Sequence, residues 1–170
     1  DVRKGDLVVR KGAVIGPVEI GILSALGVRE VLVYRVPRVG VLSVGDEVKA
    51  GLLRDYDKPM VKALVKEVGG EPIDLGVVGD DLNEIVNALR RGLSKADIVL
   101  TIGGTSVGKR DLVPRAIDVV GKPGVLVHGV SAMPGKPVAL AVVNGKPVVA
   151  LPGYPVSCFI CFRVFVEPAI

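Results

Sequence analysis

Residues 98–111, Ile-Val-Leu-Thr-Ile-Gly-Gly-Thr-Ser-Val-Gly-Lys-Arg-Asp, are the stretch of the chain that decides its fold. The apolar run of residues 98–102 predicts a strand that is buried on both faces. Asp111 then opens an amphipathic helical pattern that continues to residue 120. Because ligands of open α/β sheets bind beyond the carboxyl ends of the strands, we expect a ligand site at the turn between this strand and this helix.

This turn is rich in residues that suit a phosphorylated ligand. Glycine allows backbone N–H groups to come close to a ligand, and hydroxyl groups add hydrogen-bond donors. The residues of the turn that we expect to bind substrate are Gly103, Gly104, Thr105, Ser106 and Gly108. The turn is not G-x-G-x-x-G, and no Gly-Lys-Ser/Thr follows it, so it predicts neither a dinucleotide fingerprint nor a Walker-type loop.

The composition favours an aliphatic α/β domain. Of the 170 residues 49% are hydrophobic but only 4% are aromatic, and Trp is absent, so the core must be rich in valine and similar side chains. Such a core suits a parallel sheet.

Charge and hydropathy narrow the expected partners and location. The net charge of +4 is spread along the chain without a basic run, which argues against nucleic acid as a partner. No stretch of 18 uncharged apolar residues occurs, so we expect no membrane span and a cytoplasmic location.

From residue 39 the chain alternates strands and helices at short spacing. Strands are expected at 39–44, 72–78 and 98–102, with helices at 59–68 and 82–94 between them. After residue 120 we expect a strand at 125–130, and then a hairpin of strands 138–143 and 147–151 around Asn144-Gly145. The predicted fold is a three-layer α/β/α sandwich with a mostly parallel sheet and an antiparallel hairpin.

Residues 1–36 have a different pattern. Short strands are expected at 6–10 and 30–34, with a helix at 18–26 that Gly27 ends. Because the chain begins with Asp1, we interpret residues 1–36 as the trailing segment of a preceding, truncated domain and residues 37–170 as the α/β domain.

Three successive strands lead into acidic loops, namely Gly45-Asp46-Glu47, Gly79-Asp80-Asp81 and the glycine turn with Asp111. Asp81 or Asp111 alone is explained as a helix cap, a position where Asp is favoured. Three acidic loops beside a phosphate-binding turn favour instead a divalent cation that bridges carboxylates to an anionic ligand. We therefore predict a Mg²⁺-type site with Asp46, Glu47 and Asp80 as ligands, serving phosphoryl or adenylyl chemistry.

Two proline-rich turns complete the candidate site. In Pro134-Gly135-Lys136-Pro137 the lysine offers an ammonium group to an anion, and in residues 151–157 Ser157 offers a hydroxyl near a helix start. Proline fixes the path of such turns and glycine permits close approach. The residues expected to contact substrate here are Pro134, Gly135, Lys136, Pro152, Gly153 and Ser157. Two tight surface turns without a ligand remain the alternative.

Cys158 and Cys161 form a C-x-x-C within the apolar segment 156–162. The segment predicts a helix that is apolar nearly all round and therefore buried, so two thiols acting as small apolar side chains are favoured over a redox or zinc site. His128, the single histidine, is expected to lie at a strand end rather than to act as a catalyst.

Together these motifs resemble those of the molybdenum cofactor biosynthesis proteins, and within them the MoeA-type molybdopterin molybdenumtransferases, which are related to the C-terminal domain of gephyrin. The resemblance is carried by Leu42-Ser43-Val44-Gly45-Asp46-Glu47, Gly79-Asp80-Asp81, residues 103–108 with Asp111, Pro134-Gly135-Lys136-Pro137 and residues 151–157. It covers nearly the whole chain, with residues 37–170 similar to the molybdopterin-binding domain of the family.

The resemblance implies an enzyme that inserts molybdate into adenylylated molybdopterin and releases AMP, assisted by Mg²⁺ or another divalent cation. It implies that Glu47, Asp80 and Asp111 are the catalytic carboxylates, that residues 103–108 bind the pterin phosphate, and that Lys136 is the lysine of the family's Pro-Gly-Lys-Pro turn. It also implies a homodimer, and the molybdopterin adenylyltransferase as a protein partner.

The chain departs from the family pattern at Val44, Asp57, Met133 and Tyr154, where Thr, Asn, a basic residue and Asn are common. Two other functions stay open. One is a molybdopterin adenylyltransferase that uses Mg-ATP, and the other is a non-catalytic molybdopterin-binding or scaffold module.

Overall fold

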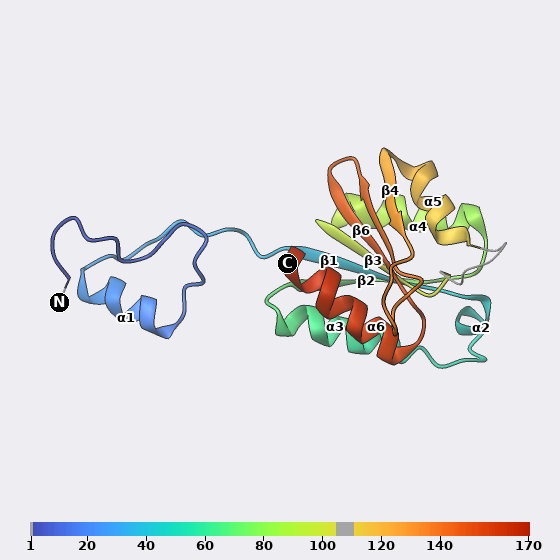
Figure 1. Ribbon diagram of the computed structural model, residues 1–170, viewed down its shortest axis with the longest axis horizontal. Coiled ribbons are helices and arrows are strands. Elements are labelled where there is room, and N and C mark those ends of the chain that lie inside the picture. The colour runs from blue at the N-terminus through green and yellow to red at the C-terminus, as the bar shows by residue number, and fades with distance from the viewer. Residues whose placement is uncertain (1, 105–110) are drawn as a thin grey trace. The chain divides into compact units, whose positions relative to one another are not determined.

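The computed structural model describes residues 2–104 and 111–170, and the chain divides into two compact units, residues 1–35 and 36–170. The larger unit contains one six-stranded sheet of order β2-β1-β3-β6-β5-β4 between two layers of helices (Figure 1). Among the described residues, none of the helices combines the length and the apolar character that crossing a bilayer requires.

The strands of the larger unit are β1 (Arg38–Val44), β2 (Glu71–Val78), β3 (Ile98–Ile102), β4 (Pro123–His128), β5 (Ala139–Val143) and β6 (Lys146–Leu151). Its helices are α2 (Asp46–Lys49), α3 (Asp57–Glu67), α4 (Leu82–Lys95), α5 (Leu112–Val120) and α6 (Pro155–Cys161). The chain continues from α6 through a π-helical turn, Phe162–Val166, and a 3-10 turn, Glu167–Ala169.

Five of the six strands run in the same direction, so the loops that follow these five strands lie at one edge of the sheet, which we call the loop edge. β1 pairs in parallel with β2 and with β3, and β3 pairs in parallel with β6. β5 is antiparallel to both of its neighbours, β4 and β6. The carboxyl ends of five strands therefore meet at one edge, and the predicted three-layer sandwich with an antiparallel hairpin is confirmed.

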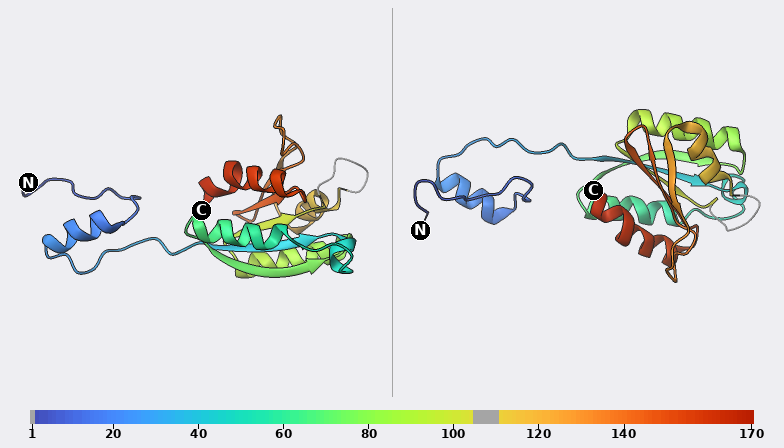
Figure 2. Two further views of the ribbon diagram at one scale, coloured as in Figure 1. Left: turned by 90° about the horizontal axis from the view of Figure 1, so that it is seen from below. Right: turned by 45° about the horizontal axis from the view of Figure 1, so that its top comes forward.

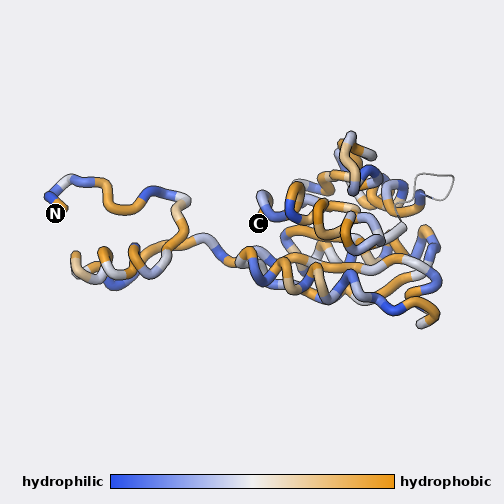
Figure 3. Tube along the Cα trace, turned by 60° about the horizontal axis from the view of Figure 1, so that its bottom comes forward, coloured by the Kyte–Doolittle hydropathy of each residue, from blue (hydrophilic) through white to orange (hydrophobic). Residues whose placement is uncertain are grey.

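Two apolar cores, one on each face of the sheet, hold the layers together. Successive residues of a strand point to opposite faces, so Leu42 joins the core under α4 and α5 while Val41 joins the core under α3 and α6. The side chains of Ile85 and Leu89 on α4 are fully buried, as their spacing of one helical turn predicts. Figure 3 shows long hydrophobic segments of the chain within this unit.

The hairpin of β5 and β6 turns at Asn144 and Gly145, as predicted. Both residues have positive φ, 50° and 80°, which a two-residue hairpin of the primed type requires. β4 begins earlier than expected, at Pro123, and ends at His128, so Val130 lies outside the strand.

The smaller unit contains one helix, α1 (Pro17–Ala25), where a helix was expected. Its start is fixed by the Gly16 N–H, which donates to the Glu19 carboxylate over 2.9 Å. The expected strands at 6–10 and 30–34 are wrong, since neither segment pairs with a strand within the described residues. An extended segment needs a partner for its backbone groups, and apolar alternation alone does not provide one.

Backbone atoms of three strand ends pack against one another at the loop edge. The Gly103 N–H donates to the Leu151 carbonyl over 3.1 Å, and a Cβ on Gly103 would lie 2.5 Å from the Val44 carbonyl oxygen. A Cβ on Gly104 would lie 2.7 Å from Val113 Cγ2. These two glycines are therefore required by packing, and the Gly103 N–H is already used within the sheet rather than free for a ligand as expected.

Replacing Gly103 with alanine should lower the free energy of unfolding by about 2–3 kcal/mol, because the change adds a backbone clash to the strain of a positive φ of 85°. Gly69→Ala is the matched control, since Gly69 has a similar φ of 88° but open space around a Cβ. It should cost only the conformational strain, about 1 kcal/mol. Urea unfolding of both variants measures the difference, and equal losses would contradict the steric argument.

A buried carboxylate lies at the start of α3. Asp57 is 5% exposed, and its Oδ1 has no hydrogen-bond partner among the described residues. Burial, and secondarily the charge of Asp55, raises the pKa of the Asp57 carboxyl group. The neighbouring Lys58 is also buried, but its Nζ donates to the Gly76 carbonyl over 2.8 Å and lies 3.3 Å from Asp74 Oδ1.

Asp57→Asn should stabilise the domain by an amount that increases with pH. Because the folded pKa of Asp57 is raised, its cost is absent below the ordinary pKa and develops as the pH rises through the folded value. Asparagine carries no charge, so the free energy of unfolding of the variant should exceed that of the wild type by about 1 kcal/mol near neutral pH. Urea unfolding at pH 3.5 and 7.5, with the exposed Glu71→Gln as control, measures it. A pH-independent difference would refute this explanation.

Candidate functional site

Two reciprocal hydrogen bonds between Asp46 and Asp80 join the loops that follow β1 and β2, and we call this pair of residues the acidic clasp. The Asp46 N–H donates to Asp80 Oδ2 over 3.1 Å, and the Asp80 N–H donates to Asp46 Oδ1 over 2.9 Å. A Cβ on Gly79 would lie 2.5 Å from Asp46 Oδ1, so the Gly-Asp order after β2 is what admits the partner carboxylate. The parallel pairing of β1 with β2 thus brings together two carboxylates that are 34 residues apart in sequence.

A lysine that the sequence analysis missed lies beside this pair. Lys49 Nζ is 2.6 Å from Glu84 Oε2, and the same Glu84 oxygen accepts the Gly79 N–H over 3.1 Å. The hydrogen bond to Glu84, assisted by the charges of Glu84, Asp46 and Asp81, raises the pKa of Lys49. Lys49 therefore stays positively charged and offsets part of the negative charge of Asp46, Asp81 and Glu84.

Asp46, Glu47 and Asp80 are the carboxylates that were predicted to bind a divalent cation. Within the two described ranges, no three His, Cys, Asp or Glu side chains are arranged to hold a metal ion. Glu47 is exposed in the first turn of α2 and takes no part in the clasp of Asp46 and Asp80. Of the three predicted ligands, Asp46 and Asp80 lie together, each with one oxygen bonded to backbone, and Glu47 lies apart from this pair of hydrogen bonds.

The two aspartates that precede helices differ in what their side chains do. Asp81 is the N-cap of α4, and its Oδ1 accepts the Glu84 N–H over 2.9 Å. Asp111 holds the N-cap position of α5, but its side chain makes no capping hydrogen bond. Capping therefore accounts for Asp81 and not for Asp111.

Asp111 is bonded instead to His128. His128 Nε2 lies 2.8 Å from Asp111 Oδ2, and the Asp111 side chain is only 15% exposed. Burial raises the pKa of Asp111, with the nearby His128 acting in the opposite direction. The sequence analysis did not assign His128 to the site. The available signal was its place at the end of β4, a strand that points to the same edge as β1, β2 and β3.

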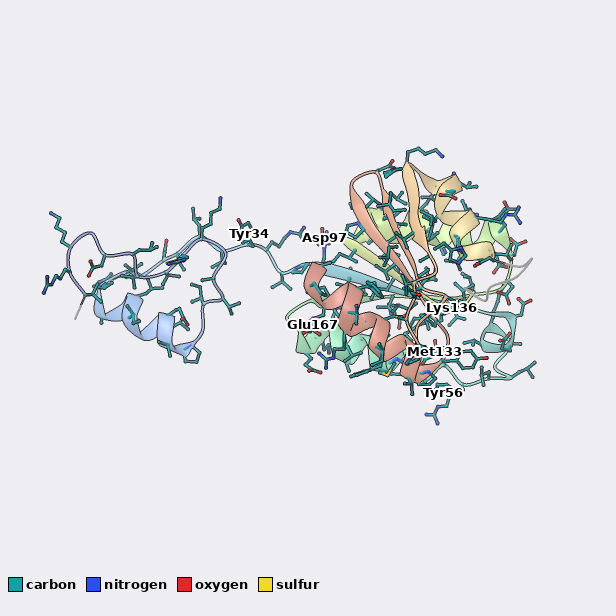
Figure 4. All side chains as sticks on the ribbon, in the orientation of Figure 1. Tyr34, Tyr56, Asp97, Met133, Lys136 and Glu167 are labelled. Carbon is teal, nitrogen blue, oxygen red and sulfur yellow. The ribbon has the colours of Figure 1, made fainter. Side chains whose placement is uncertain are left out.

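The turn Pro134-Gly135-Lys136-Pro137 lies on the connection between β4 and β5, which projects from the sheet (Figure 2). The Val130 N–H donates to the Lys136 carbonyl over 2.9 Å and closes the connection. Lys136 and Met133 are both exposed there (Figure 4). A Cβ on Gly135 would lie 2.8 Å from Cys161 Sγ, so this glycine allows the turn to pack against α6.

The second proline turn leads into α6. Pro152 is buried, Gly153 is exposed, and a Cβ on Gly153 would lie 3.3 Å from Gly103 Cα, so this turn adjoins the glycine turn after β3. Ser157 is half-buried in the first turn of α6.

The two thiols of α6 behave as predicted, but the helix is not buried all round. Cys158 and Cys161 are free and buried, and burial raises the pKa of both thiols. Val156 is 66% exposed, and Phe159 and Ile160 are each 37% exposed. The expectation of a fully buried helix is therefore wrong, because the helix covers the sheet with one face only.

The site is extended along the sheet edge. The acidic clasp lies at the ends of β1 and β2, the glycine turn follows β3, and Asp111 with His128 lies at the end of β4. Four strand spacings separate β1 from β4, or about 19 Å. Such an edge suits an elongated ligand. The predicted Thr105, Ser106 and Gly108 lie outside the described residues.

Comparison with known proteins identifies the domain. A family model described as "Probable molybdopterin binding domain" matches residues 40–170. The molybdopterin molybdenumtransferases of Haemophilus influenzae and Staphylococcus aureus strain COL are 38% and 36% identical over the whole of this chain. The chain spans only 43% and 42% of the length of these two relatives.

Solved structures agree with this relationship. Two structures of the molybdopterin biosynthesis protein MoeA from Pyrococcus horikoshii match with TM-scores of 0.82 and 0.76, at 36% and 32% identity. The matches cover 96% and 99% of this chain, and 42% and 41% of those chains. The MoaB protein of Thermus thermophilus shares the fold, with a TM-score of 0.69 at 23% identity over 79% of this chain and 92% of that one. This chain therefore belongs to the molybdopterin-binding domain family of molybdenum cofactor biosynthesis.

Proposed function

We propose that this domain binds adenylylated molybdopterin along the loop edge of its sheet and takes part in inserting molybdate into it, with release of AMP. The observation that carries the proposal is the arrangement of this edge, where a pair of carboxylates lies on one side of the glycine turn and the half-buried Asp111 with its partner His128 lies on the other. The relatives of similar sequence that bear the name molybdopterin molybdenumtransferase support the same assignment.

Asp46 and Asp80 are the residues that would hold Mg²⁺ together with phosphate oxygens of the ligand. Mg²⁺ commonly binds in this way, through one or two carboxylates, water and substrate phosphates, so a closed protein cage is not required. When bound, the cation would neutralise phosphate charge and favour departure of the AMP phosphate. Glu47 lies beside the pair on the exposed side of α2 and is proposed as a further group of this acidic end.

Asp111 has the properties expected of a group that holds and releases a proton. Its pKa is raised by burial, which brings proton exchange closer to neutral pH than for a solvated aspartate. Lys136 is exposed on the neighbouring connection and is proposed to attract the anionic substrate, whether molybdate or phosphate. A homodimer and a contact with the molybdopterin adenylyltransferase remain proposals.

The assignment predicts that the chain, given Mg²⁺ and adenylylated molybdopterin, releases AMP only when molybdate is added. Chromatographic quantification of AMP measures this directly. Release that does not depend on molybdate would reject the proposal. Consumption of ATP in the presence of molybdopterin would support the adenylyltransferase alternative. Binding without turnover that Asp111→Asn leaves unchanged would support the scaffold alternative.

The role of the clasp predicts that Asp80→Asn weakens Mg²⁺-dependent binding of adenylylated molybdopterin by about tenfold, a typical loss for a single metal-site group. The asparagine oxygen can still accept the Asp46 N–H, so the fold should be retained. Asp81→Asn is the matched control, because it removes the same charge one residue away while asparagine keeps the cap of α4. Isothermal titration calorimetry with and without Mg²⁺ compares them. Equal losses in the two variants would count against a specific role of Asp80.

A further inference from the structure

We propose that His128 is a positioning residue for Asp111, holding one carboxylate oxygen so that the other is presented to the ligand. The proposal deepens the function proposed above and rests on it. Its basis is the 2.8 Å contact between His128 Nε2 and Asp111 Oδ2, together with Asp111 Oδ1, which is buried and unpartnered among the described residues.

The sequence after Asp111 removes one of the two backbone N–H groups that its side chain would normally cap. An N-cap carboxylate normally accepts the N–H of the second or third helical residue. In α5 the third helical residue is Pro114, which has no N–H to donate. The Asp111 carboxylate makes no capping bond and lies against His128 instead. The helix start thus leaves the carboxylate available for another partner.

His128 lies on a strand, and Asp111 directly precedes a helix that packs on that strand. His128 is the last residue of β4 and is paired with Ala139 of β5. α5 packs on β4, and Asp118 of α5 accepts the Val125 N–H over 2.9 Å. A site built on a helix and a strand holds its geometry more closely than one built on loops. The imidazole therefore reaches Asp111 from a rigid base.

An unpaired buried carboxylate oxygen is costly unless a donor reaches it. Because His128 occupies Oδ2, rotation of the carboxyl group cannot satisfy Oδ1 without breaking the contact to the imidazole. A donor from the bound substrate would satisfy Oδ1. Loss of the imidazole would free the Asp111 carboxylate to rotate. Removing His128 should therefore lower kcat more than it raises KM.

The contact itself can be tested without turnover, because His128 is the only histidine. Imidazole nitrogen–proton NMR spectra of the ¹⁵N-labelled full chain should show one spin system, with a protected Hε2 proton on Nε2. Asp111→Ala should abolish this protected proton, and Asp81→Asn should leave it in place. Identical imidazole spectra for wild type and Asp111→Ala would overturn the proposal.

The role in the reaction is tested by His128→Leu and His128→Gln. Leucine cannot donate, so kcat for molybdate-dependent AMP release should fall about tenfold or more, with KM for adenylylated molybdopterin changed less than about threefold. Glutamine offers an amide N–H at similar reach and should restore kcat to within about threefold. Leu126→Gln, an exposed position on the same strand, should behave as wild type.

Unchanged kcat in His128→Leu, or equal losses in the leucine and glutamine variants with intact folding, would overturn the proposal. Failure of the wild-type chain to release AMP would instead count against the proposed function. In that case the Hε2 signal, and its response to adenylylated molybdopterin with Mg²⁺, still shows whether His128 holds the Asp111 carboxylate.

Discussion

The site depends on the absence of a side chain at position 103, because the Val44 carbonyl oxygen occupies the space where a Cβ would lie. This close approach, with the bond from the Gly103 N–H to Leu151, aligns the ends of β1, β3 and β6. Parallel pairing then sets the end of β2 beside that of β1. The acidic loops lie at a common edge because the strands before them end together.

The acidic end of the site is held by hydrogen bonds between protein groups, and this arrangement shows which carboxylate oxygens are left for a cation. Asp46 and Asp80 each accept a backbone N–H of the other, and the charge of Asp46 acts on the nearby Lys49. One oxygen of each carboxylate is used to join the two strand ends, and both side chains are exposed. The same residues therefore contribute to the fold and to the proposed site, so changes that remove their acceptor oxygens would affect both.

The elements of the larger unit were predictable because their signals are local. Buried runs such as 98–102, the periodicity of α4 and the Asn144-Gly145 turn each specify a structure within a few residues. The failures concern partners distant in sequence. Nothing local shows that residues 6–10 and 30–34 lack a strand partner, or that α6 exposes Phe159. His128 was missed for the same reason, since its contact with Asp111 requires the sheet order.

The Cys161 thiol donates to the Gly135 carbonyl over 3.5 Å, and there is no room between them for another methyl group. Protein interiors are close-packed, so a side chain at position 135 or a larger residue at position 161 would push the turn and α6 apart. The position of the lysine that would meet the anion therefore depends on a glycine next to it and on a thiol of the C-terminal helix.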